Sequence, residues 1–175
     1  GPETEQLLRS VNIQGLARLG NIDQQPVPVT GDPQLFNRQL LNKLLPTIRR
    51  AAAHSQTTIY SAVIAEQLTQ PMLYLLYHGP EGTWIGAQDT RYFVELQQAI
   101  SFGNKGHAAI VDAEGKVLAH PKESWRQNAR NLSKVPPVAA MMQGQTGVSQ
   151  FFSPAVKADM IAGYAAVPEV GWGVM

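Results

Sequence analysis

Short apolar runs bounded by turn-forming residues are the feature that most constrains the fold of this chain. Six such runs are predicted to be strands: residues 58–65, 72–78, 83–88, 147–154, 160–167 and 172–175. Runs of this length between clusters of glycine, proline and polar residues are typical of β-strands. No strand–helix–strand rhythm joins them, so the strands are expected to pair antiparallel.

A further hairpin is predicted between residues 107 and 120. The strings HAAIVD and KVLAH flank the turn 112–115, and its Asp-x-x-Gly pattern fits a type I turn closed by a glycine at positive φ.

His107, Asp112 and His120 lie on this hairpin and are candidate ligands of a metal ion. Side chains alternate along a strand, which puts His107 and Asp112 on opposite faces, and His120 is expected to make a hydrogen bond at the hairpin end. The sequence therefore predicts no metal and no cofactor.

Apolar residues recur at helical spacing in five other segments: residues 3–19, 36–48, 90–101, 123–130 and 136–143. Residues 21–33 carry three prolines and are expected to form a loop. The fold class predicted from this order is α+β, with an antiparallel sheet flanked by helices and preceded by a long N-terminal helix over residues 3–19.

Composition excludes several classes of protein. The chain has 175 residues with 14 Lys and Arg against 13 Asp and Glu, so its net charge of +1 offers no basic stripe for nucleic acid. It has no Cys, which removes disulfide scaffolds, Cys-ligated zinc and thiol catalysis. The chain has no run of about 20 apolar residues, the length that a membrane helix needs.

Three strings in the second half resemble the membrane-proximal half of a Cache domain, a PAS-like sensor module. They are FGNKGHAAIVDAEGKVLAHP at residues 102–121, GQTGV at 144–148 and GYAAVPEVGWGVM at 163–175. The three runs between residues 58 and 88, with the helix that follows, resemble the end of a membrane-distal Cache subdomain. The Arg-x-Trp-Tyr segment of the amino-acid-binding branch is absent, so amino-acid recognition is not supported.

The resemblance implies three parts: a signalling and dimerisation helix at 3–19, a partial membrane-distal subdomain at 20–93 and a membrane-proximal PAS-like subdomain at 94–175. It implies the periplasmic, ligand-sensing region of a bacterial inner-membrane receptor, anchored by membrane helices outside this sequence. Such receptors work as homodimers. They drive a diguanylate cyclase or phosphodiesterase, a histidine kinase or a chemotaxis domain.

Five residues are candidates for binding a small molecule in such a fold. Arg126 offers bidentate donors to a small carboxylate, beside the aromatic face of Trp125. Phe151 and Tyr164 lie on predicted strands and can line the same pocket, and Asp159 can accept an ammonium group. Each also has an ordinary structural interpretation: a solvated arginine, core aromatic residues, and a turn aspartate bonded to its own backbone.

Three function classes remain open from the sequence. The first is the ligand-sensing region of a transmembrane receptor. The second is a Cache-fold interaction module that senses a periplasmic protein without a small-molecule ligand. The third is an enzyme of unrecognised type, which we do not expect because no catalytic motif such as Gly-x-Ser-x-Gly or His-Glu-x-x-His occurs. No catalytic residue is therefore predicted.

Overall fold

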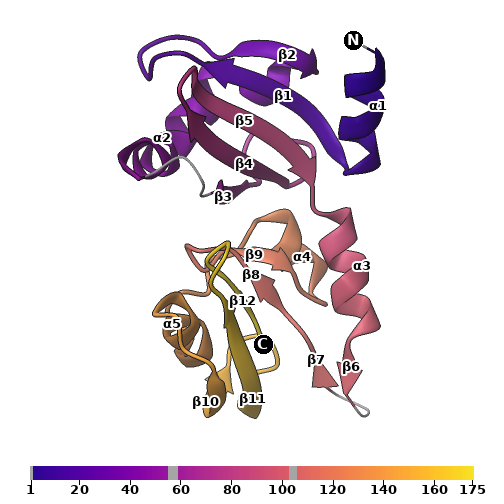
Figure 1. Ribbon diagram of the computed structural model, residues 1–175. Helices are drawn as coiled ribbons and strands as arrows, with labels where there is room; N and C mark the ends of the chain where they lie inside the picture. The colour runs from indigo at the N-terminus through magenta and orange to yellow at the C-terminus, as the bar shows by residue number, and fades with distance from the viewer. Residues whose placement is uncertain (1, 55–58, 103–105) are drawn as a thin grey trace. The chain divides into compact units, whose positions relative to one another are not determined.

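The computed structural model describes residues 2–54, 59–102 and 106–175 (Figure 1). Thr58, predicted to begin a strand, and part of the string at 102–121 lie outside these described residues. The chain divides into two compact units, Gly1–Asp89 and Thr90–Met175, whereas the sequence placed a boundary between residues 93 and 94. Each unit has its own five-stranded antiparallel sheet, which confirms the α+β class.

The first unit has five strands, which pair antiparallel in the order β2-β1-β5-β4-β3. Its elements in chain order are α1 (Pro2–Ser10), β1 (Ile13–Leu19), β2 (Val27–Gly31), the 3-10 helix η1 (Pro33–Phe36), α2 (Arg38–Ala53), β3 (Ile59–Ile64), β4 (Met72–Gly79) and β5 (Gly82–Asp89). The three predicted strands between residues 58 and 88 correspond to β3, β4 and β5.

The prediction of one long helix over residues 3–19 is wrong. The helix α1 ends at Ser10, and Asn12 follows with a φ of 60°, a left-handed conformation that asparagine tolerates and that breaks a helix. Beyond it the burial alternates, with Ala17 and Leu19 inward, so β1 pairs with both β2 and β5. The predicted loop at 21–33 is also partly wrong, because it contains β2.

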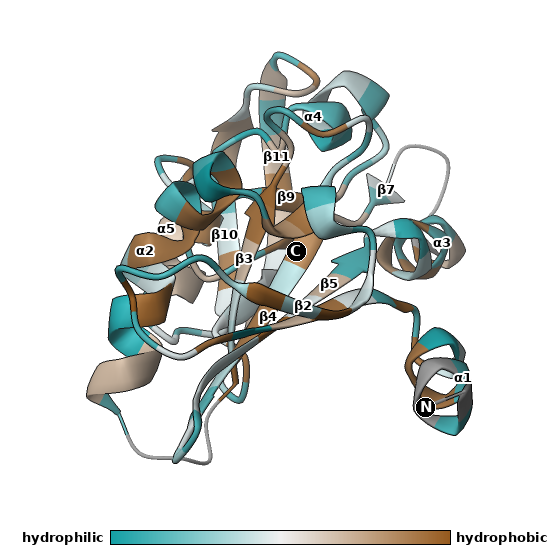
Figure 2. Ribbon diagram, turned by 90° about the horizontal axis from the view of Figure 1, so that it is seen from above, coloured by the Kyte–Doolittle hydropathy of each residue, from teal (hydrophilic) through white to brown (hydrophobic). Residues whose placement is uncertain are grey.

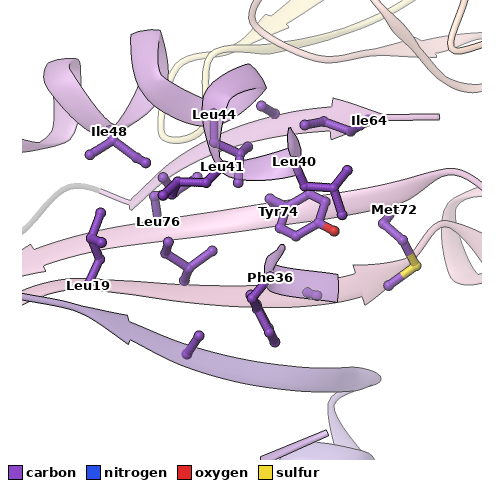
Figure 3. Close-up of a cluster of buried hydrophobic side chains, with 14 residues drawn as sticks. Leu19, Phe36, Leu40, Leu41, Leu44, Ile48, Ile64, Met72, Tyr74 and Leu76 are labelled. Atoms are coloured by element: carbon purple, nitrogen blue, oxygen red, sulfur yellow. The ribbon is translucent and has the colours of Figure 1, made fainter. Parts of the chain in front are cut away.

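The core of the first unit forms where α2 packs on strands β3 and β4 (Figure 3). Asn37 caps this helix through a hydrogen bond that its side chain accepts from the Leu40 amide at 3.0 Å. Four α2 side chains are almost fully buried: Leu40, Leu41, Leu44 and Ile48. Tyr74, at the middle of β4, is fully buried and donates its hydroxyl to the Leu35 carbonyl at 2.8 Å. Burial raises the pKa of the Tyr74 phenol, so the group stays a donor.

The second unit also has five strands in its main sheet, in the order β10-β11-β12-β8-β9. Its elements are α3 (Arg91–Ala99), β6 (Ser101–Phe102), β7 (Gly106–His107), β8 (Ile110–Val111), β9 (Val117–Ala119), α4 (Glu123–Gln127), α5 (Pro136–Met142), β10 (Gly147–Ser153), β11 (Ala158–Val167) and β12 (Trp172–Val174). Strands β6 and β7 pair with each other alone. The helix α3 carries both hydrophilic and hydrophobic residues (Figure 2), and its Phe93 packs edge-to-face on Trp172.

The turn between β8 and β9 confirms the predicted hairpin. The Asp112 carboxylate accepts hydrogen bonds from the Glu114 and Lys116 amides, each at 2.9 Å. Gly115 has a φ of 78°, and a β-carbon there would lie 2.9 Å from the α-carbon of Ser133, so no side chain fits at this position. Hydrogen bonds within the turn therefore stabilise the hairpin, and these contacts fix the position of its end at His120.

The two sheets have the same topology. When the strands of each unit are numbered from the unit's own first main strand, both orders read 2-1-5-4-3. In both units the helical segment lies between the second and third strands: η1 and α2 in the first unit, α4 and α5 in the second. The two units therefore share a strand order and differ mainly in the helices between their second and third strands.

We expect Leu44→Ala to lower the free energy of unfolding of the first unit by about 2–5 kcal/mol, because it leaves a cavity between α2 and the sheet. Urea unfolding measures this change. Val27→Ala is the matched control, since the Val27 side chain is 62% exposed and its truncation should cost less than about 0.5 kcal/mol. Equal losses in the two variants would contradict the packing described here.

Candidate ligand-binding site

A cavity of about 400 Å³ lies within the second unit, a size typical of small-molecule pockets. It is lined by residues of β7, β10 and β11, by the end of β9, by α4 and by the segment before α5. Most of the lining is apolar, including Trp125, Leu132, Val135, Phe151, Met160 and Met175. The polar side chains that line it are His107, His120 and Ser153. A molecule in this cavity would thus meet an apolar wall with a few hydrogen-bonding groups.

His120 is the most constrained of these polar residues. It is 3% exposed, and its Nδ1 accepts a hydrogen bond from the Lys122 amide at 2.9 Å. The predicted hydrogen bond at the hairpin end is therefore confirmed. The imidazole ring stacks on Trp125 with ring centroids 4.7 Å apart, and the His107 ring meets it edge-on at 5.5 Å. These contacts fix both the plane of the ring and its tautomer.

The His120 ring is held in its neutral form. Burial lowers the pKa of His120 to about 4, and the positive charges of His107, Arg126 and Lys122 add to the effect. Because Nδ1 accepts from a backbone amide, the proton of the neutral ring lies on Nε2. His120 therefore offers an Nε2–H donor to a molecule in the cavity at neutral pH.

Cationic side chains lie over the ring of Trp125, which lines the cavity. The Arg130 guanidinium carbon lies 4.5 Å from the centre of the Trp125 ring, and the Lys122 ammonium lies 5.2 Å from it. Within the described part of the chain, neither of these residues nor Arg126 forms an ion pair with a carboxylate. The potential on this side of the cavity is therefore positive.

The structure brings two of the five predicted site residues, Trp125 and Phe151, to the lining of the cavity. Arg126 is outside the lining and donates from Nη1 to the carbonyls of His120, at 2.6 Å, and Pro121, at 3.2 Å. Tyr164 packs against the buried cluster around Trp125 and Met141. Asp159 is exposed on β11 and outside the lining. The roles of all five toward a ligand remain predictions.

The sequence analysis did not include His120, Ser153 or Met160 among the ligand-binding residues. A signal for His120 was present: it ends the hairpin and precedes Trp125 by five residues, and the start of α4 at Glu123 brings the two rings together. Ser153 and Met160 lie on opposite sides of the β10–β11 turn, and nothing in their sequence surroundings marks them. Among the residues that the structure describes, no three His, Asp or Glu side chains are grouped so as to hold a metal ion.

Comparison with known proteins relates this chain to sensor domains through its fold. The extracellular domain of rpHK1S-Z16, assigned as a histidine kinase, superimposes with a TM-score of 0.70 at 15% identity, over 99% of this chain and 76% of that one. The periplasmic sensory domain of the Campylobacter jejuni chemoreceptor Tlp1 gives 0.64 at 13%, over 98% and 74%. The ligand-binding domain of the Pseudomonas aeruginosa amino acid chemoreceptor PctC, in complex with GABA, gives 0.60 at 16%, over 99% and 77%.

These likenesses establish the class of fold. The chain has the fold of the extracellular sensor domains of histidine kinases and chemoreceptors, which confirms the Cache-like fold indicated by the sequence. These solved structures are sensor domains rather than enzymes. No family model and no curated protein matches the sequence. No helix in the described ranges is long and apolar enough to cross a membrane.

The buried His120 ring predicts a specific loss of stability in acid. Between about pH 6.5 and pH 4 the unfolded chain takes up a proton at this residue that the folded chain does not, so the free energy of unfolding falls as the pH falls. The full shift corresponds to about 3 kcal/mol. Water in the cavity screens part of it, and we expect about 1–2 kcal/mol.

Urea unfolding of the wild type and His120→Asn at several pH values measures this contribution. Asparagine keeps an acceptor near the Lys122 amide and does not titrate, so the variant should lose about 1–2 kcal/mol less than the wild type over the same pH window. His54→Asn, at an exposed position of the first unit, is the matched control and should follow the wild type. Parallel pH profiles for the wild type and His120→Asn would contradict the assignment.

Proposed function

We propose that this chain is the extracytoplasmic ligand-sensing region of a bacterial transmembrane receptor and that the cavity of the second unit binds its ligand. The periplasmic side of the inner membrane is the proposed location. The output is proposed to be a diguanylate cyclase or phosphodiesterase, a histidine kinase or a chemotaxis domain elsewhere in the same protein. Support for this class comes from the shared fold of the sensor domains described above.

The observation that carries the proposal is the composition of the cavity wall. About 400 Å³ of space is bordered by apolar side chains, among which His120 has an unused Nε2–H donor in the described structure. A few oriented polar groups in an apolar pocket are the usual arrangement for binding a small molecule. The chemoreceptor PctC, whose ligand-binding domain has this fold, is known in complex with GABA, a small molecule with a carboxylate and an ammonium group.

Signalling requires that the ligand distinguish two conformations. A micromolar ligand supplies about 8 kcal/mol of binding free energy. Moving a receptor from 1:99 to 99:1 takes a difference of roughly 5.5 kcal/mol between the two states. We propose that a homodimer supplies these states and that α1 contributes to the dimer contact. Leu7 in this helix is 65% exposed, and Val11, just after the helix, is 53% exposed. An unchanged dimer after removal of residues 2–10 would contradict the role of α1.

One observation favours the second function class, a module that senses a protein partner. The outer face of the β10–β11 hairpin exposes Val148 (73%), Phe152 (61%) and Ile161 (73%). Apolar residues gathered on an exposed face are typical of interaction sites. In this alternative Phe152→Asp would abolish signalling in the whole receptor, and filling the cavity would leave it unchanged.

The ligand-sensing proposal predicts that filling the cavity abolishes ligand binding. Ala162→Phe places a ring in the cavity from β11, whereas Ala165→Phe adds the same ring on the exposed face of the same strand. A thermal-shift screen of small organic acids, amines, amino acids and nucleobases provides the measurement. A ligand at 100 times its dissociation constant should add about 2.7 kcal/mol of stability to the wild type and to Ala165→Phe, and none to Ala162→Phe.

Stabilisation that persists in Ala162→Phe would place the ligand outside this cavity. Silence of the whole screen on a cooperatively unfolding wild type would favour the protein-sensing alternative.

A further inference from the structure

The charge of the cavity wall limits the ligands that it can accept. Among the residues that the structure describes, its lining contains no Asp or Glu side chain, and its polar side chains are two imidazoles and one hydroxyl, besides the indole of Trp125. A buried ammonium group needs a carboxylate or several acceptors to offset its desolvation. A free amino acid or an amine would therefore leave its charged nitrogen without a partner in this cavity.

The donor at His120 selects the opposite chemistry. Its Nδ1 is occupied by the Lys122 amide, so Nε2–H is the atom that remains for a ligand, and it can only donate. The ring cannot turn to present its other nitrogen without losing that bond and its stacking on Trp125. The ligand group next to His120 must therefore be a hydrogen-bond acceptor.

Positive charge near this donor favours an acceptor that is anionic. Lys122 and Arg130 lie over the Trp125 ring, and Arg126 is bonded to the His120 carbonyl, none of them in an ion pair within the described structure. The groups around the His120 ring from each neighbouring element are His107 of β7, Lys122 before α4, and Trp125 and Arg126 of α4. None of them is acidic, so a carboxylate at this position meets attraction and no opposing charge.

We propose, on the basis of the sensing function above, that the cavity binds a monocarboxylate with an apolar body and no ammonium group, held by a hydrogen bond from His120 Nε2. The apolar body lies among Phe151, Leu132 and Met160, which line the cavity beyond the imidazoles. Arg126 acts here as a positioning residue, because its guanidinium holds the carbonyls of His120 and Pro121 rather than the ligand.

Two matched series of probes test this proposal by isothermal titration of the 175-residue chain. The first is 3-phenylpropanoate, 3-phenylpropanamide and phenylalanine, and the second is hexanoate, hexanamide and 2-aminohexanoate. Within each series the apolar body is constant and only the charged groups change. We expect a carboxylate to bind at least about tenfold more tightly than its amide and its amino acid, the usual value of a charge-assisted hydrogen bond.

His120→Asn separates a ligand contact from a structural role. Asparagine retains an acceptor for the Lys122 amide and lacks the Nε2–H donor, so carboxylate binding should weaken about tenfold while amide binding changes little. His54→Asn is the matched control and should bind like the wild type.

The proposal is overturned if the amides or the amino acids bind as tightly as the carboxylates, if His120→Asn leaves carboxylate affinity unchanged, or if none of the six probes binds. Its failure is distinguishable from that of the sensing function. Binding of an amine, amino acid or neutral molecule that Ala162→Phe abolishes would leave the cavity as the sensory site and exclude only the carboxylate. Absence of binding by every class of molecule would contradict both.

Discussion

Covering one face of an antiparallel sheet is the physical requirement on which the rest of this structure depends. Both units meet it with the segment between the second and third strands of the same 2-1-5-4-3 order. In the first unit this segment contains the 16-residue α2, whose leucines pack directly on β3 and β4. In the second unit it contains helices of only five and seven residues, and a cavity of about 400 Å³ lies next to α4. The lengths of the helices in this connection thus differ between the unit with a packed core and the unit with a cavity.

The same local contacts give that cavity its chemical character. The β8–β9 turn fixes the end of the hairpin, the Lys122 amide fixes the tautomer of His120, and Arg126 holds the backbone that carries the ring. Burial, aided by the surrounding positive charges, lowers the pKa of the imidazole and keeps it neutral, and those charges make the site favourable for an electron-rich group. The same positive charges therefore disfavour a second proton on the ring and favour an anion beside it.

The sequence predicted the local structure of the second unit well because its signals are local. The Asp112 to Gly115 turn, the proline-bounded helices and the alternating strands each depend on residues close along the chain. The segment at residues 13–19 was misread because its leucines fit a helical spacing, whereas pairing with β5, some 70 residues away, makes it a strand. The cavity lining was only partly predictable for the same reason: Trp125 and Phe151 are large and conspicuous, but the place of His120 and Met160 depends on which segments meet in space.

The cavity also shares part of its wall with the backbone ladder at the centre of the second sheet. Ala109 and Met175 both line it, and they exchange two hydrogen bonds, at 2.7 and 3.0 Å, that extend the pairing of β8 with β12. A molecule that presses on either side chain therefore acts on the register of the innermost strands rather than on a surface loop. An occupant of the cavity would therefore contact the sheet itself, at residues that pair one central strand with its neighbour.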